Sequence, residues 1–251
     1  MSVSAFIIVC PMVFLAGIID SIAGGGGLIS LPSFLFAGLP IHTALATNKL
    51  SSTCGTGLAT FRLVRKKPVS LRLAVPGVLF GLLGSVAGAH FSLLIPEKTL
   101  KYLLLALLPA IVFCVMNKRL FKDNPDSDLQ FNRRMLIKIS LSSLSIGIYD
   151  GIYGPGTGTF LIIAFTVFTH MSTVQANAYA KIINLSTNIA ALAVFLLRKQ
   201  VIIPLGAAAA ASNMLGNYIG SGLVMKKGAK ISRPLIIAVL ILLTIKIIVD
   251  F

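Results

Sequence analysis

Charged side chains are scarce in this chain of 251 residues, and acidic ones are the scarcest. Only 12% of the residues are charged and seven are acidic, whereas a soluble domain carries roughly 25% charged residues. Uncharged runs such as 21–48, 151–180 and 200–225 reach or exceed the ~20 residues needed to cross a bilayer. These runs exclude a soluble fold of this length, and the sequence predicts an all-α polytopic membrane protein.

Other absences narrow the class further. The three cysteines are isolated, without CxxC or metal spacing, so neither a disulfide framework nor a metal site is expected. No Lys or Arg precedes Lys49, so the first apolar run lacks the basic start of a signal peptide, and we expect a retained helix. The chain has no P-loop ending, HExxH motif or Gly-x-Ser-Gly motif. These absences disfavour a nucleotide-driven pump and an enzyme, and no cofactor is expected.

Positive charge is abundant, and its placement is typical of a membrane protein. The formal net charge is +15, and the 22 Lys and Arg residues gather in short stretches between the apolar runs. Such stretches orient membrane proteins, because cytoplasmic loops are enriched in Lys and Arg. Stretches 62–72 and 118–138 are therefore expected on the cytoplasmic side of the membrane. Nucleic acid is not an expected partner.

The chain divides into two similar parts. Residues 1–116 and 135–251 are expected to form two transmembrane repeats, joined by a polar linker over 117–134. Similar segments are 17–24 and 147–154, 44–49 and 176–181, and the glycine pairs Gly84/Gly88 and Gly216/Gly220. The glycine pairs also favour close helix packing. The distribution of basic residues favours inverted repeats, with parallel repeats as the alternative.

The hydrophobic pattern predicts about eight membrane-spanning helices. They cover 4–22, 44–64, 72–94, 99–116, 134–150, 171–197, 201–225 and 233–250. Two shorter apolar segments, 28–39 and 159–169, each follow a glycine cluster. At ~1.5 Å per residue they reach only about 17 Å. They are expected to be half-helices or re-entrant segments.

Two aspartates and two lysines lie within apolar sequence, at matching places in the two parts. Asp20 and Asp150 each directly precede a glycine cluster, and Lys49 and Lys181 lie in otherwise uncharged helices. Charges inside a bilayer cost several kcal/mol, so they pair, face a cavity, or do both. The aspartates are expected to cap the adjoining half-helix, to pair with a lysine, or to carry a coupled proton. For Lys49, snorkelling to the interface is a further alternative.

Polar side chains form a stripe on each of the helices that carry these lysines. The stripes are Lys49, Thr53, Thr56 and Thr60 on one helix, with Ser52 adjacent, and Asn177, Lys181, Asn184 and Asn188 on the other. Asn48, next to Lys49, is a further candidate for binding. In the matched register of the two parts, Ser52 is expected to face Asn184 and Thr56 to face Asn188. The stripes favour an aqueous path between the parts, with interhelical hydrogen bonding as the alternative.

The two glycine clusters lie where half-helices begin. They comprise Gly24, Gly25, Gly26 and Gly27, and then Gly154, Gly156, Thr157 and Gly158. A helix N-terminus offers unpaired N–H groups and roughly half a positive charge, so it binds anions. Packing or hinge glycines are the alternative. Together with the lysines and the polar stripes, the clusters predict a pocket for a small anion that has several oxygens.

Three segments, 19–27, 46–50 and 149–160, resemble the sulfite exporter TauE/SafE family. The run Asp-Gly-Ile-Tyr-Gly-Pro-Gly-Thr-Gly over 150–158 is the most specific of them, and the resemblance covers nearly the whole chain. The resemblance implies a multi-pass inner-membrane permease of sulfite, thiosulfate, sulfoacetate or related organosulfur anions.

A secondary transporter working by alternating access is the resulting prediction. The anion would lie near the membrane midplane, neutralised by Lys181 and, in second place, by Lys49. The expected partners are this anion, a coupled proton or ion, and the lipid bilayer. A passive anion channel is the main alternative, and an intramembrane enzyme is a weaker one.

Overall fold

The structure is a computed structural model that describes residues 3–66, 69–104, 106 and 132–227. Within these ranges the chain folds into α-helices, and no strand occurs. The helices are α1 (Val3–Ala23), α2 (Gly27–Phe36), α3 (Ile41–Lys66), α4 (Leu71–Leu94), α6 (Arg133–Ile152), α7 (Thr157–Thr169), α8 (Thr173–Leu197) and α9 (Ile203–Lys227). The predicted helix 233–250, most of 99–116 and most of the predicted linker 117–134 lie outside the described residues.

The predicted helix ends need two corrections larger than two residues. Helix α3 begins at Ile41 instead of 44, because the chain already turns at Pro40, whose carbonyl accepts from Ala44 N at 2.8 Å. Helix α2 ends at Phe36 instead of 39. The helix ends there because Gly38 has a left-handed φ of 82°, which is incompatible with a continuing helix.

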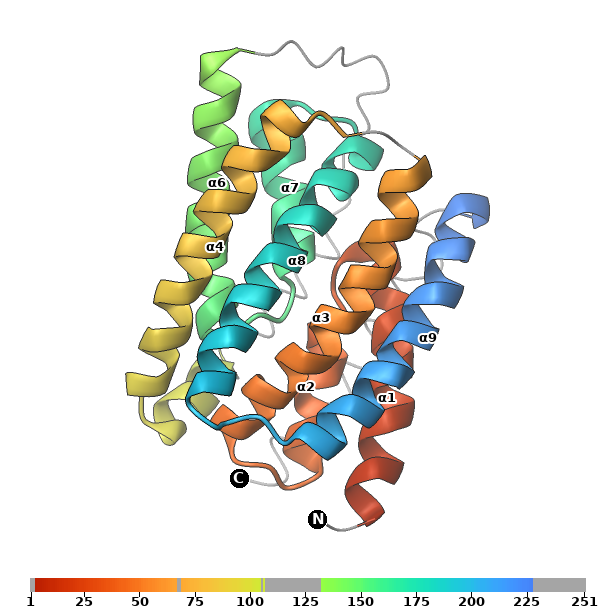
Figure 1. The fold of residues 1–251 in the computed structure, drawn as a ribbon, viewed down its shortest axis with the longest axis vertical. Helices are drawn as coiled ribbons and strands as arrows, with labels where there is room; N and C mark the ends of the chain where they lie inside the picture. Colours follow the sequence, from red (N-terminus) through yellow and green to blue (C-terminus); the bar gives the residue numbers. More distant parts are fainter. Residues whose placement is uncertain (1–2, 67–68, 105, 107–131, 228–251) are drawn as a thin grey trace.

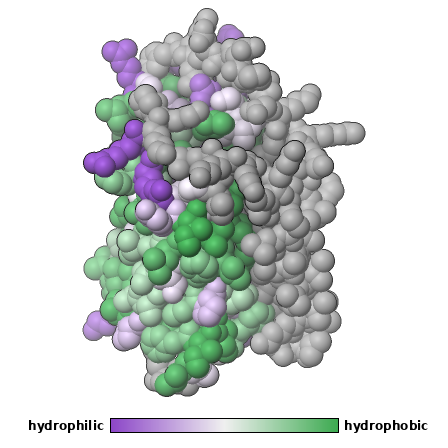
Figure 2. Space-filling model, turned by 90° about the vertical axis from the view of Figure 1, so that its right-hand side faces the viewer, coloured by the Kyte–Doolittle hydropathy of each residue, from purple (hydrophilic) through white to green (hydrophobic). Residues whose placement is uncertain are grey.

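Four described helices are long and apolar enough to cross a membrane. They contain the segments Val3–Ile22, Leu71–Leu94, Arg133–Ile152 and Thr173–Leu197. Helices α3 and α9 are equally long but less apolar, because they carry polar residues along their length. On the face drawn in Figure 2, hydrophobic residues cover much of the lower part, and the most hydrophilic ones gather towards the upper end. These features agree with a polytopic membrane protein.

Helices α3 and α8 lie side by side in the bundle and run in opposite directions (Figure 1). Helix α9 packs against α1 and α3, and α4 packs against α6 and α8. The glycine pairs allow this close packing, as predicted. A Cβ added at Gly88 would lie 2.9 Å from the carbonyl carbon of Ile148, and one added at Gly220 would lie 2.9 Å from Ile18 Cα.

The short helices α2 and α7 follow sharp breaks in the chain. Gly24 (φ 73°) lies between α1 and α2, and Gly154 (φ 93°) lies between α6 and α7. Left-handed backbone of this kind favours glycine, which has no Cβ. The short helices predicted after the glycine clusters are therefore present. They run in opposite directions, α2 downwards and α7 upwards in Figure 1.

Candidate functional site

The two glycine breaks touch each other inside the bundle. A Cβ added at Gly24 would lie 2.7 Å from Gly158 Cα, and one added at Gly27 would lie 2.9 Å from Pro155 Cα. Real Cβ atoms essentially never approach other atoms below 3.0 Å. Only glycine therefore fits at Gly24 and Gly27 without a shift of the backbone, and the N-terminal ends of α2 and α7 are brought together.

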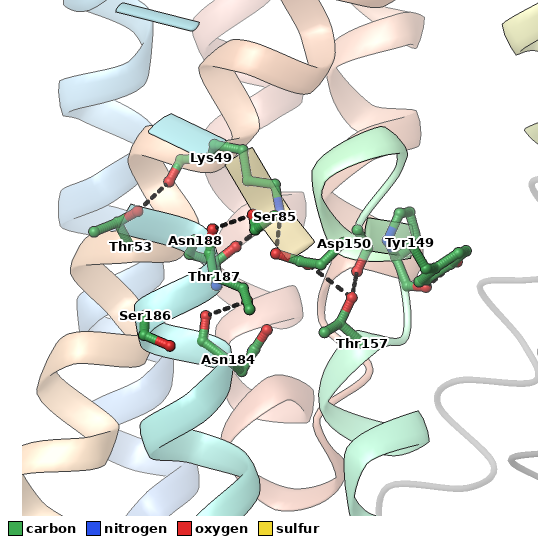
Figure 3. A network of polar contacts seen from close by, with 12 residues as sticks. Lys49, Thr53, Ser85, Tyr149, Asp150, Thr157, Asn184, Ser186, Thr187 and Asn188 are labelled. Atoms are coloured by element: carbon green, nitrogen blue, oxygen red, sulfur yellow. Dashed lines mark hydrogen bonds and ion pairs between the residues drawn. The ribbon is translucent and has the colours of Figure 1, made fainter. Parts of the chain in front are cut away.

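Lys49 lies beside this meeting point and binds side chains from two other helices. Its Nζ is 2.7 Å from Asp150 Oδ2 of α6 and donates to Asn188 Oδ1 of α8 at 3.0 Å (Figure 3). The other carboxylate oxygen, Asp150 Oδ1, accepts from Thr157 Oγ1 at 2.7 Å. Lys49 and Asp150 are only 3% and 1% exposed. Lys49 is thus a buried, paired cation, and it does not snorkel.

A second ion pair repeats the arrangement with the partners exchanged. Lys181 Nζ of α8 lies 2.7 Å from Asp20 Oδ2 of α1 and donates to the Asp20 carbonyl at 2.5 Å. Thr56 Oγ1 donates to Asp20 Oδ2 at 3.5 Å. Each pair joins one residue from the first part of the chain to one from the second. Both aspartates therefore pair with a lysine, which was one of the sequence-based alternatives.

The two polar stripes meet in reverse order, because α3 and α8 are antiparallel. Asn188 Oδ1 accepts from Lys49 Nζ, near the start of α3. Towards the other end of α3, Thr60 Oγ1 donates to the Lys181 carbonyl at 3.2 Å. The expectation that Thr56 faces Asn188 as its partner is corrected accordingly, since Thr56 contacts Asp20.

A pocket opens where the breaks, the ion pairs and the stripes come together. It holds about 400 Å³ of space outside the protein atoms, part of it open to solvent. It is lined by Asp20, Gly24, Gly26, Gly27, Asn48, Lys49, Ser52, Thr56, Gly154, Gly158, Asn184, Asn188 and Asn213. Four residues predicted for binding do not line it, namely Gly25, Gly156, Thr157 and Lys181. Thr157 and Lys181 instead hold the two aspartates.

Asn213 of α9 is a lining residue that the sequence reasoning missed. The sequence feature that could have revealed it is a pair of asparagines four residues apart, Asn213 and Asn217, in a helix that consists mostly of small and apolar residues. Helical spacing of this kind places both side chains on one face.

The pocket offers hydrogen-bond donors but little net charge. The backbone N–H groups of Gly26, Gly27 and Gly158 find no acceptor among the described residues. They belong to the first turns of α2 and α7, where a helix carries its partial positive charge. Each lysine is balanced by an aspartate. This combination suits a small anion with several oxygens. The described ranges contain no group of three or more His, Cys, Asp or Glu that could hold a metal ion.

Comparison with known proteins agrees with a transport role. ORF9 of Sinorhizobium sp, a probable membrane transporter protein, is 37% identical over 238 residues, covering 94% of this chain and 90% of that protein. The probable membrane transporter protein YfcA of Escherichia coli (strain K12) is 35% identical over 237 residues, or 94% and 87% of the two chains. A probable membrane transporter protein of Haemophilus influenzae is 34% identical over 241 residues, or 94% and 92%.

No solved structure matches the chain. Residues 9–247 match the family described as Sulfite exporter TauE/SafE, which covers nearly all of the sequence. The chain is a multi-pass membrane protein and belongs to the sulfite exporter TauE/SafE family of membrane transporters.

Proposed function

We propose that this protein is a secondary transporter that moves a small sulfur-containing anion across the cytoplasmic membrane by alternating access. Sulfite, thiosulfate and organosulfonates are the candidate substrates. The observation that carries the proposal is the pocket at the meeting point of two broken helices, flanked by two buried lysine–aspartate pairs. Broken helices whose N-terminal ends face an anionic substrate recur in secondary transporters.

The anion would bind between the free N–H groups of the helix starts and the Lys49 ammonium. Lys49 lines the pocket directly, whereas Lys181 only contacts Asp20. We therefore assign the direct charge contact to Lys49 and an indirect role to Lys181, the reverse of the ranking expected from the sequence. Ser52 of the same helix also lines the pocket, and its hydroxyl can donate to a further oxygen of the anion, whereas the Thr56 hydroxyl already donates to Asp20.

The ion pairs suggest how a proton could accompany the anion. In the paired state each lysine charge is already compensated by an aspartate, so the substrate anion would meet little net attraction. A proton taken up by Asp150 would cancel the carboxylate and leave the Lys49 ammonium free to bind the anion. For an anion with one negative charge, such as hydrogen sulfite, the charge within the pocket would then be the same before and after loading, which avoids an uncompensated charge in a low-dielectric site.

Helix directions support two inverted repeats as the basis of the movement. In Figure 1, α1 and α3 run upwards and α4 runs downwards, whereas α6 and α8 run downwards and α9 runs upwards. Inversion of this kind is common in secondary transporters. We propose that residues 1–116 and 135–251 are the repeats, joined by 117–134, with about eight membrane spans in total. Rocking of one repeat against the other would exchange access to the pocket.

The contact between the glycine breaks disfavours a passive channel. Gly24 and Gly158 touch backbone to backbone beside the pocket, which leaves no room there for a continuous pore. A carrier needs such a closed point, because the pocket must be sealed on one side at a time.

Uptake into proteoliposomes tests the proposal. The purified protein is incorporated into vesicles, and uptake of radiolabelled sulfite, thiosulfate and sulfoacetate is measured with and without a pH gradient. We expect saturable uptake of at least one anion, inhibition by its unlabelled analogues, and stimulation by an inward proton gradient. Lys49→Met should abolish this uptake, and the variant Lys138→Met, at an exposed lysine, serves as its matched control. Uptake that does not saturate would favour the channel, and no uptake by correctly folded protein would refute the substrate class.

A further inference from the structure

Helix α9 contributes a buried amide pair to one wall of the pocket. Asn213 lines the pocket and is 4% exposed, and Asn217, one turn further along α9, is fully buried. Buried polar groups cost free energy unless they are hydrogen-bonded. A pair of asparagines at this depth therefore calls for a physical role.

Contacts made by Asn217 fix the orientation of the Asn213 amide. Asn217 Nδ2 donates to the Asn213 carbonyl at 3.1 Å and to Asn213 Oδ1 at 2.6 Å. A backbone carbonyl only accepts, so the Asn217 atom at this point is the nitrogen, and the Asn213 side-chain atom that it meets is the oxygen. The Asn213 Nδ2 group is thereby left as a donor, and no described residue accepts from it.

Glycines on two neighbouring helices make the space for this pair. A Cβ added at Gly55 of α3 would lie 2.6 Å from Asn213 Cγ and 2.7 Å from Asn217 Nδ2. A Cβ added at Gly17 of α1 would lie 3.2 Å from Asn213 Oδ1. Any larger residue at Gly55 would collide with the amides. The donor is thus held in one place by tight packing on both sides.

The other part of the chain has no equivalent donor. Aligning the two glycine pairs described above sets Gly81 against Asn213 and Ser85 against Asn217. Gly81 packs closely on Thr187, since a Cβ added there would lie 3.2 Å from Thr187 Cγ2. Ser85 Oγ donates to the Thr187 carbonyl at 2.6 Å. The positions of α4 that correspond to Asn213 and Asn217 therefore supply no amide to the pocket.

The geometry points to Asn213 as a residue that binds and selects the anion, with Asn217 as its positioning residue. This inference rests on the proposed function. Because the charged groups at the pocket are already paired, a neutral N–H donor adds attraction for an anion without adding another charge. A donor fixed in direction matches an oxygen atom at a defined place. Asn213 thus favours anions with several oxygens on one sulfur over a spherical anion such as chloride.

Binding of radiolabelled sulfite, thiosulfate and sulfoacetate to the full-length protein in detergent tests this role, with unlabelled chloride as the competitor. We expect Asn213→Ala to weaken sulfite binding about 10- to 100-fold, as for loss of a hydrogen bond to a charged group. Asn213→Asp keeps the shape and the oxygen that Asn217 contacts, but it loses the donor and adds a negative charge that repels the anion, so it should weaken binding further than Asn213→Ala. Chloride competition should change little, so the preference for sulfite over chloride falls.

Asn177→Ala is the matched control, because Asn177 lies on α8 and does not line the pocket. Unchanged sulfite affinity and unchanged sulfite-to-chloride preference in Asn213→Ala and Asn213→Asp would overturn the inference and leave the proposed function intact. No saturable binding of any of the three sulfur anions to the unaltered protein would overturn the proposed function, and this inference with it.

Discussion

Removing the charges of the Lys49–Asp150 pair one at a time separates its structural role from its proposed binding role. At 2.7 Å and an effective dielectric constant of about 20, the attraction between these charges is about 6 kcal/mol. Part of this attraction is offset by the cost of burying both ions. Removal of one partner from a buried pair therefore costs about 3–5 kcal/mol, because the other charge stays buried without compensation.

Lys49→Met should accordingly lower the melting temperature by about 6–20 °C, at roughly 2–4 °C per kcal/mol for a chain of this size. The double variant Lys49→Met/Asp150→Asn removes both charges and should regain most of that loss, because uncharged replacement of a buried pair is often close to neutral. Asp150→Asn alone leaves the ammonium without its carboxylate. It should be destabilised when empty and stabilised by sulfite more strongly than the unaltered protein.

The melting temperatures of the unaltered protein, the two single variants and the double variant are measured by thermal unfolding in detergent, with and without sulfite. Chloride at equal ionic strength controls for general salt effects. We expect sulfite to raise the melting temperature most in Asp150→Asn, less in the unaltered protein, and not in Lys49→Met or the double variant. Exposed Lys138→Met should behave like the unaltered protein. A double variant that responds to sulfite as strongly as the unaltered protein would refute Lys49 as the counter-ion of the substrate.

Three further changes test other parts of the site and the fold. Asp150→Asn should abolish stimulation of uptake by a pH gradient, because a carboxamide cannot take up the proton that we assign to Asp150; stimulation equal to that of the unaltered protein would exclude this role. Gly24→Ala should abolish uptake and lower stability more than Gly38→Ala, because both glycines are left-handed but only Gly24 has neighbours within 4 Å of an added Cβ. Gly88→Ala should cost about 1–3 kcal/mol of stability by overpacking the α4–α6 contact. Gly222→Ala, which meets open space, should be nearly neutral in the same thermal unfolding assay.

Much of the helical architecture could be predicted from the sequence, because glycine clusters interrupt long apolar runs and apolar periodicity marks the helices. Helix ends were less predictable where a single residue decides them. The start of α8 was placed at 171, yet Ser172 caps the helix through Gln175 N, and the Gln175 side chain accepts from Ser172 N. This capping box was readable as Ser-x-x-Gln, and Thr173 is the first helical residue.

The candidate pocket was predictable in composition but not in its pairings. Two lysines and two aspartates in apolar sequence can pair in two ways, and nothing local selects one of them. Lys181 and Asp20 are 161 residues apart, so only the tertiary fold brings them together. Comparison of the two parts of the chain highlights only positions that match. Asn213 was missed because the corresponding residue in the other part is Gly81.

Helices α2 and α7 meet head to head, with Gly24 in contact with Gly158. Each N-terminal end carries roughly half a positive charge, so two like ends repel when nothing negative lies between them. A bound anion would be attracted to both helix ends at once and would hold the two parts of the protein together. Binding of the anion would then strengthen the contact between α2 and α7, and its release would weaken it.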